Sequence, residues 1–248
     1  MLASAIPNLA EWAAAWLVAY LVGSIPFGVV IARSRGVDIR QHGSGNIGAT
    51  NVGRVLGQRL GLLCFLLDLL KGLIPSVLAG WLMGIFAAGS HPPLQTLAWL
   101  AVPVAAIAGH MFPVWLRFRG GKGVATGLGA LVGIFPVLTA AALAVFGIWV
   151  LCARITRYVG ISSCVAALLM PFFAGVSSVV SQYVSHARAA AANARASHSF
   201  SITGAASNAW PYIVVTALLA ALVIYKHRGN IRRTIEGTEM KIGERVQV

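Results

Sequence analysis

A polar stretch at residues 43–54, GSGNIGATNVGR, holds the side chains with the clearest chemical potential in this chain. It contains four glycines, no carboxylate, and the polar residues Ser44, Asn46, Thr50, Asn51 and Arg54. Glycine lets backbone N–H groups converge without a Cβ in the way, and hydroxyl, amide and guanidinium groups add further donors. The pattern predicts an anion site; the alternative is a flexible loop whose arginine meets lipid headgroups.

A second polar stretch, GHMFPVWLRFRGGKGVATG at residues 109–127, places RGGKG before a predicted helix that begins near Val124. Backbone donors at a helix N-terminus favour anions, and Lys122 adds a point charge. Taken alone, GGKG is a weak signal, and its spacing is not that of a Walker A loop. His110 is either a site residue or a hydrogen-bonding partner of a neighbouring loop.

A third stretch, HRGNIRRTIEGTEMKIG at residues 227–243, follows the last apolar run directly. His227 and Asn230 are three residues apart, so they share a face if the stretch is helical. Arg232 and Arg233 are expected to contact anionic lipid. The two carboxylates, Glu236 and Glu239, either orient basic groups in the other loops or cap a solvated tail.

Two ionisable residues, Asp68 and Lys71 in LLDLLKGLIP, lie inside an apolar run at i, i+3 spacing. Ionisable residues at membrane depth are costly and often functional. The two side chains either neutralise each other or hold the first loop from beneath, and we expect a structural support role. Ser24 and Pro26 in GSIPFG predict a distortion near the end of the first span.

The composition places these stretches in a membrane protein. The 248 residues are 58% hydrophobic and only 10% charged. A soluble domain carries about 25% charged residues. The formal charge of +13 is better explained by basic cytoplasmic loops than by nucleic acid. The chain is therefore predicted to be an all-α integral membrane protein, without nucleic acid as a partner.

Apolar runs occur near 9–32, 59–84, 94–116, 124–152, 158–183 and 207–226. The fourth run is longer than one straight span requires and contains Phe135-Pro136. It is either one long kinked helix or a short helix (124–135) followed by a full one (137–153). With the split and the N-terminus outside, all but three of the 19 basic residues become cytoplasmic; the exceptions are Lys71, Arg188 and Arg195. We therefore expect about seven transmembrane helices, one of them short, with a cytoplasmic C-terminus.

This topology predicts one polytopic domain over residues 1–248. Its cytoplasmic site loops would be 33–58, 116–126 and 226–248, so the three polar stretches share one face. Residues 184–206 would form a periplasmic loop of small and polar residues. Its alanine-rich middle is either a surface helix or disordered.

The three polar stretches, in this order, resemble the signature blocks of the acyl-phosphate:glycerol-3-phosphate acyltransferase family (PlsY). GSIPFG, VDIRQHGSGN and LDLLKG agree with it as well, so the resemblance covers about residues 20–243. It implies a multi-pass enzyme of the bacterial inner membrane, with its site at the cytoplasmic face. The enzyme would transfer an acyl group from acyl phosphate to the 1-hydroxyl of glycerol 3-phosphate, giving lysophosphatidic acid and phosphate.

The resemblance also implies roles for individual residues. A first phosphate-binding loop would comprise Ser44, Gly45, Asn46, Thr50, Asn51 and Arg54, and a second Gly120, Gly121, Lys122 and Gly123. His227 and Asn230 would complete the site, with Arg54, Lys122, His227 and Asn230 in the catalytic roles. Thr234 and Met240 stand where the family commonly has Leu and Pro, and both only flank the expected ligands.

Such a site must hold two anions side by side and stabilise the oxyanion that forms on the acyl carbon. Arg54, Lys122 and the glycine-loop amides are the candidates for this work. None of the six histidines is followed by an Asp five positions on, so an HxxxxD dyad is absent. The general base is therefore either His227 or, as the resemblance favours, a phosphate oxygen of the substrate. The acyl groove is expected to lie along residues 124–144.

A transporter for a phosphorylated small molecule is the alternative function, although transporters usually bind near the midplane. A CDP-alcohol phosphotransferase would need an aspartate cluster for metal, and the chain has only Asp38 and Asp68. We expect no metal and no cofactor. Expected partners are glycerol 3-phosphate, acyl phosphate and membrane lipids, with a functional monomer. The sequence leaves open the acyl-chain preference and which loop holds which phosphate.

Overall fold

The structure, a computed structural model, describes residues 8–87, 91–192 and 200–246, and within these ranges it contains helices and no strands. Its α-helices are α1 (Leu9–Gly23), α2 (Phe27–Arg33), α3 (Ala49–Leu56), α4 (Gln58–Leu82), α5 (Pro93–Met111), α6 (Val124–Val132), α7 (Val137–Thr156), α8 (Val159–Ala192), α9 (Ile202–Ser207), α10 (Trp210–Lys226) and α11 (Arg228–Ile235). Three short 3₁₀ turns, Ile39–Gln41, Ile85–Ala87 and Val114–Leu116, lie between them. The predicted all-α fold is confirmed.

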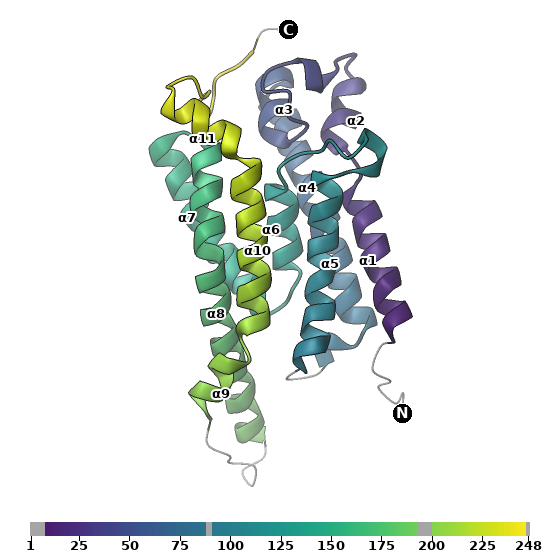
Figure 1. The fold of residues 1–248 in the computed structure, drawn as a ribbon, viewed down its shortest axis with the longest axis vertical. Coiled ribbons are helices and arrows are strands. Elements are labelled where there is room, and N and C mark those ends of the chain that lie inside the picture. Colours follow the sequence, from purple (N-terminus) through teal and green to yellow (C-terminus); the bar gives the residue numbers. More distant parts are fainter. Residues whose placement is uncertain (1–7, 88–90, 193–199, 247–248) are drawn as a thin grey trace.

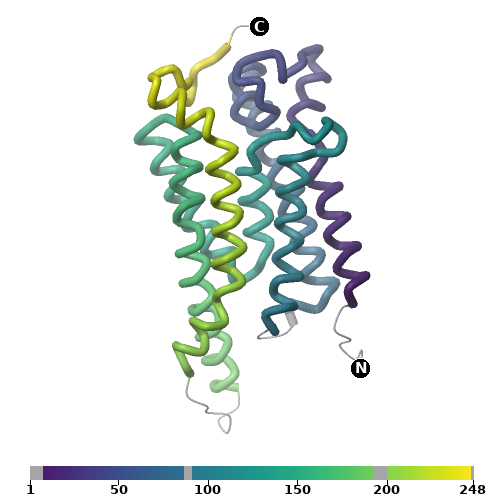
Figure 2. The backbone as a smooth tube through the Cα atoms, in the orientation of Figure 1, coloured from purple at the N-terminus to yellow at the C-terminus, as the bar shows by residue number. Residues whose placement is uncertain are grey.

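The long helices run side by side and alternate in direction along the bundle (Figures 1 and 2). Among the described residues, six helical segments are long and apolar enough to cross a membrane. The nine-residue α6 lies between them and packs mainly against α4. The predicted break of the fourth apolar run is confirmed, because α6 ends at Val132 and α7 begins at Val137.

Glycines set how closely the helices approach one another. Gly23 of α1 lies against the carbonyl of Ala106 in α5, and Gly72 of α4 lies against that of Thr126 in α6. A Cβ at either glycine would collide with backbone, so these contacts require the absence of a side chain. Small residues allow membrane helices to pack through direct backbone contact. The close α4–α6 contact brings the start of the short helix next to the middle of α4.

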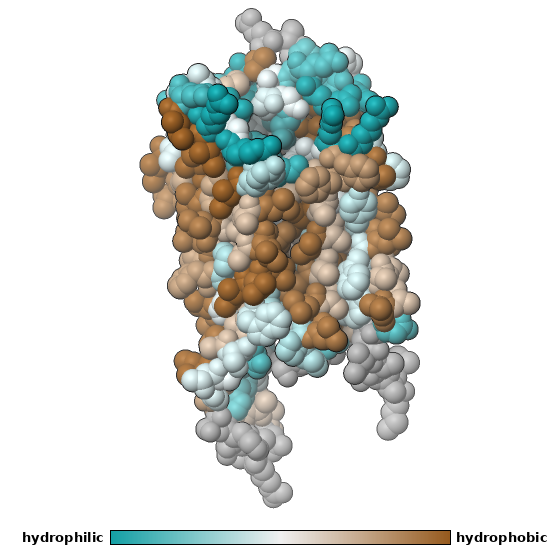
Figure 3. Space-filling model, viewed as in Figure 1, coloured by the Kyte–Doolittle hydropathy of each residue, from teal (hydrophilic) through white to brown (hydrophobic). Residues whose placement is uncertain are grey.

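Polar and apolar side chains separate along the bundle axis. Hydrophilic residues gather at the end formed by α2, α3 and α11, and apolar residues cover the sides (Figure 3). Exposed apolar side chains on the sides include Leu62, Trp81, Leu168, Phe172 and Leu218. This distribution matches a bundle whose sides face lipid hydrocarbon and whose one end is polar.

Helix α8 is longer than the sequence predicted. The prediction placed a loop from residue 184, whereas the helix continues without a break to Ala192. Alanine has the highest helix propensity, and the run SHARAAAA extends the helix beyond the apolar segment. Residues 193–199 of the predicted loop lie outside the described residues, and α9 follows.

Candidate active site

A polar cavity of about 780 Å³, counting its open mouth, lies near the polar end of the bundle. All three polar stretches contribute to it, as do α4, α5, α7 and α8. Of the predicted site residues, it is lined by Ser44, Asn46, Thr50, Asn51, Arg54, Lys122, Gly123, His227 and Asn230. The structure therefore brings together nine predicted site residues that are far apart in sequence.

Asn51 holds the first loop in shape and is almost completely buried. Its Oδ1 accepts from the Ser44 amide at 2.9 Å, and its Nδ2 donates to the carbonyls of Ile39 and His42 at 3.2 and 3.0 Å. These bonds occupy most of the capacity of the amide group. Asn51 therefore positions Ser44 at the cavity, a role in loop geometry that the sequence did not distinguish from ligand binding.

The first turn of α3 faces the cavity. Asn46 accepts from the Gly48 amide at 2.9 Å, and Gly48 is the residue that precedes the helix. Gly48, Ala49 and Thr50 all line the cavity. Unpaired N–H groups and the dipole at a helix N-terminus favour an anion.

Arg54, one turn further along α3, is 8% exposed and lines the cavity. One guanidinium nitrogen donates to the Met240 carbonyl at 2.6 Å, while Nε has no partner among the described residues. Burial lowers the pKa of Arg54, and the charges of Glu239 and Glu244 partly oppose this. Because an arginine stays protonated despite such shifts, it presents a fixed positive charge with unused donors.

Gly120 and Gly121 support the second loop without lining the cavity. Their amides donate to the carbonyls of Met111 and His110 at 3.2 and 3.0 Å. A Cβ on Gly121 would strike the imidazole of His110. The N–H groups of Gly120 and Gly121 are therefore occupied, and binding of a phosphate by these amides stays a prediction. The same holds for Gly45, whose amide donates to the carbonyl of His42 at 3.0 Å.

Lys122 emerges from this loop into the cavity, and its Nζ donates to Oδ1 of Asn230. Burial lowers the pKa of Lys122 to about 8. The negative charge of Glu239 raises this pKa, and the positive charges of Arg233 and Arg54 lower it further. A lysine with this pKa is charged at pH 7 and loses its charge as the pH rises through about 8. Two of the predicted catalytic residues thus contact each other directly.

His227 ends α10 and precedes α11, and it is 2% exposed. Its Nδ1 lies 2.8 Å from the Val223 carbonyl. Since a carbonyl only accepts, Nδ1 carries the proton and Nε2 is an acceptor. Burial, followed by the charge of Lys122, lowers the pKa of His227 to about 4. His227 is therefore a neutral imidazole at physiological pH.

Glu239 accepts hydrogen bonds from groups of its own stretch, whereas the sequence had suggested basic groups in the other loops or a solvated tail. Its Oε1 accepts from Asn230 and its Oε2 from Arg233, both at 2.7 Å. Glu236 instead pairs with exposed Arg232 at the surface. Glu239 lines the cavity but was not among the predicted site residues.

A buried charged cluster forms part of the cavity wall, which Asp68 and His110 both line. Asp68 Oδ1 is 2.7 Å from Lys71 Nζ and 3.6 Å from His110 Nδ1, and all three side chains are at most 5% exposed. Lys71 also donates to the Ile25 carbonyl at 2.8 Å, in the break between α1 and α2 that the sequence predicted at Ser24 and Pro26. The two side chains therefore neutralise each other, one of the roles considered from the sequence, and their further contacts are with the break after α1 and with His110, not with the first loop.

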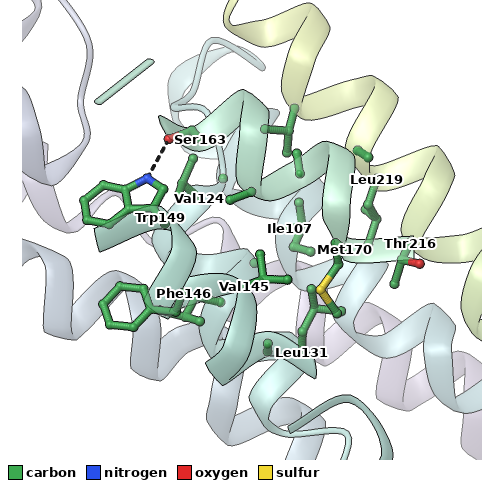
Figure 4. A pocket seen from close by; sticks show the side chains of 18 of the residues that line it. Ile107, Val124, Leu131, Val145, Phe146, Trp149, Ser163, Met170, Thr216 and Leu219 are labelled. Carbon is green, nitrogen blue, oxygen red and sulfur yellow. Dashed lines mark hydrogen bonds between the residues drawn. The ribbon is translucent and has the colours of Figure 1, made fainter. Parts of the chain in front are cut away.

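An apolar cavity adjoins the polar one and shares four lining residues with it, namely Phe65, Gly123, Val124 and Trp149. Its walls come from α5, α6, α7, α8 and α10 (Figure 4). Trp149 donates to Ser163 Oγ at 3.1 Å where the two cavities meet. The arrangement can hold a phosphate-bearing group above and a hydrocarbon chain below. No group of three metal-ligating side chains occurs within the residues that the structure covers.

Comparison with known proteins gives a consistent result. A family model described as glycerol-3-phosphate acyltransferase matches residues 13–237. Proteins named glycerol-3-phosphate acyltransferase from Geotalea daltonii and Geobacter sulfurreducens are 40% and 42% identical over 221 and 225 residues. The matches cover 89% and 90% of this chain, and 92% and 93% of the two relatives.

Solved structures agree with this similarity. The crystal structure of PlsY, an integral membrane glycerol 3-phosphate acyltransferase, in its glycerol 3-phosphate form is 36% identical, with a TM-score of 0.72. That match covers 94% of this chain and 96% of the other. Its lysophosphatidic acid form gives 35% identity and a TM-score of 0.70, over 94% and 95%.

Proposed function

The chain belongs to the glycerol-3-phosphate acyltransferase family, and on this premise we propose that it transfers an acyl group from acyl phosphate to the 1-hydroxyl of glycerol 3-phosphate. The products are lysophosphatidic acid and inorganic phosphate. The observation that carries the proposal is the continuity of the two cavities: a polar chamber with Arg54 and Lys122 opens at Trp149 into an apolar one.

Both substrates bring phosphate to the polar cavity. Arg54, Lys122 and the first turn of α3 supply positive charge and N–H donors on different walls. Holding both phosphates there would place the glycerol hydroxyl beside the acyl carbonyl carbon, and proximity of this kind supplies much of a transfer enzyme's rate. The same donors would stabilise the developing oxyanion, as preorganised dipoles do in acyl transfer.

In the reaction the 1-hydroxyl oxygen bonds to the acyl carbon, and the bond from that carbon to the phosphate oxygen breaks. The hydroxyl proton has two possible acceptors. The conjugate acid of His227 has a pKa of about 4, which makes it a weak base, whereas a phosphate monoester has a second pKa of about 6. This comparison supports the phosphate of glycerol 3-phosphate as the base, with His227 Nε2 as a neutral acceptor that orients the hydroxyl.

The acyl chain would lie in the apolar cavity. The residues expected from the sequence, 124–144, supply part of its lining, including Gly127, Leu131 and Ala142. Burying a hydrocarbon chain there is favourable by about 0.8 kcal/mol per CH₂ relative to water. We place the polar end at the cytoplasmic face of a bacterial inner membrane, because most of the basic residues gather there.

A donor test distinguishes this proposal from its rivals. The purified protein is given glycerol 3-phosphate with either palmitoyl phosphate or palmitoyl-CoA, without added metal. We expect lysophosphatidic acid from palmitoyl phosphate alone. Product only from the thioester would retain acyl transfer and reject the donor. Uptake of labelled glycerol 3-phosphate into vesicles, with no product from either donor, would favour a transporter.

A further inference from the structure

The walls of the apolar cavity have nearly equal length on four helices. The lining residues extend from Gly123 to Leu131 before and along α6, from Trp149 to Ala142 on α7, from Ser163 to Met170 on α8, and from Val223 to Thr216 on α10. Each wall covers eight or nine residues, or seven or eight steps of about 1.5 Å, which gives a depth of roughly 10–12 Å. The lining therefore has a similar depth on all four helices.

A packed layer closes the cavity at that depth. One helical turn beyond the deepest lining residues of α7, α8 and α10 lie Leu138, Ala174 and Tyr212, on the same helix faces. Ile134 follows the end of α6 in the connection to α7. Tyr212 is 7% exposed and the other three are fully buried, and all four belong to one hydrophobic core. Protein interiors of this kind are close-packed and leave no room for further carbons.

The floor itself is chemically suited to a methyl terminus. Met170 and Leu131 present apolar atoms. Thr216 donates its hydroxyl to the Tyr212 carbonyl at 2.6 Å, which leaves its methyl group toward the cavity. Figure 4 shows Val124, Trp149 and Ser163 together at one end, and Leu131 and Met170 toward the other.

We propose that this floor sets the acyl-chain length that the enzyme prefers, and that Met170 is a specificity-determining residue. The inference rests on the proposed function, since it requires the acyl carbonyl at the polar end and the chain below. A zigzag of carbon–carbon bonds of about 1.5 Å advances roughly 1.3 Å per carbon, so the cavity holds about eight or nine carbons below Trp149. Carbons beyond the floor must bend or leave between the helices, at a cost in binding.

The test measures kcat/KM for octanoyl, decanoyl, dodecanoyl and palmitoyl phosphate with three variants. Met170→Ala deepens the cavity, and the ratio of dodecanoyl to decanoyl phosphate is expected to rise about tenfold, as one or two methylenes in a fitted pocket provide. Ala166→Leu fills the α8 wall at mid-depth, and the preference is expected to move to shorter chains by a similar factor. Leu168→Ala is the matched control, because that side chain is 69% exposed on the same helix.

Active variants whose chain-length ratios equal that of the unmodified protein would overturn the proposal. If Met170→Ala unfolds in detergent, Ala166→Leu carries the same comparison, with Met170→Leu, which conserves volume, as its control. The outcome also separates two failures. Product with unchanged ratios counts against the floor alone, whereas no product from any acyl phosphate with the unmodified protein counts against the proposed function.

Discussion

At the scale of single residues, His227 is placed as a hydrogen-bond acceptor more than as a base. Its Nδ1 proton is held by the Val223 carbonyl, and its pKa of about 4 reflects burial beside Lys122. His227→Ala is expected to lower kcat about tenfold, because a required general base supplies roughly 10²–10⁴. The measurement is a steady-state assay with both substrates saturating. His186→Ala is the control, because His186 lies toward the other end of α8. A loss of kcat above a thousandfold in His227→Ala would instead make His227 the general base.

Lys122 gives a distinct pH dependence. Its pKa of about 8 means that its positive charge is present below that pH and is lost as the pH rises through it. Because we propose that this charge binds phosphate, kcat/KM for glycerol 3-phosphate is expected to fall as pH rises through about 8. Lys122→Arg keeps the charge at all these pH values and is expected to remove the alkaline fall while lowering the maximum. An identical alkaline limb in both proteins would assign the pKa to another group.

At the scale of elements, the second loop is held by contact between Gly121 and the end of α5. The Gly121 amide donates to the His110 carbonyl, and a Cβ at this position would meet the His110 ring. Gly121→Ala is therefore expected to displace Lys122 and raise the KM for glycerol 3-phosphate about tenfold or more, with a smaller change in the melting temperature. Gly147→Ala, where a Cβ would meet nothing, should leave KM unchanged. An unaltered KM in Gly121→Ala would show that the loop does not depend on this contact.

The ion pair at the cavity wall joins three elements, because Lys71 of α4 contacts Asp68 and the Ile25 carbonyl, and Asp68 contacts His110 of α5. Asp68→Asn leaves the Lys71 charge buried without a partner, which typically costs about 3–5 kcal/mol of unfolding free energy. Thermal unfolding in detergent measures the loss, and Asp68→Asn with Lys71→Met is expected to recover much of it.

The exposed pair of Asp38 and Arg40 provides the matched control for this comparison. Solvent screens a pair at the surface, so Asp38→Asn should change the unfolding temperature little. An Asp68→Asn protein as stable as the unmodified one would contradict the support role of the cluster.

At the scale of the whole molecule, the helices and their break near Pro136 could be predicted because apolar length and proline position are properties of the linear sequence. The same properties predicted that the polar stretches lie at one end of the bundle, and nine of the predicted site residues line one cavity there. The contact of His110 with Asp68 depends on how α5 packs against α4, and no local pattern encodes it. The contact of Asn230 with Glu239 depends on how the chain after α11 folds back onto that helix. The apolar cavity was expected only along 124–144, since its other walls come from α5, α8 and α10.

The break in the fourth apolar run also decides on which sides of the membrane the chain's two ends lie. Helix α10 separates α9 from α11, so the two lie at opposite ends (Figure 1). Because α6 and α7 run in opposite directions, α9 is the one that lies at the end where α1 begins. Thr203 of α9 and Thr238 after α11 are exposed, so each can be replaced by cysteine and tested with a membrane-impermeant maleimide. Thr203→Cys is expected to label in intact spheroplasts and Thr238→Cys only after lysis. The reverse pattern above the background of the native cysteines, with Thr238→Cys labelled in intact spheroplasts and Thr203→Cys only after lysis, would reject seven crossings from an outside N-terminus and return the short helix to a single kinked span.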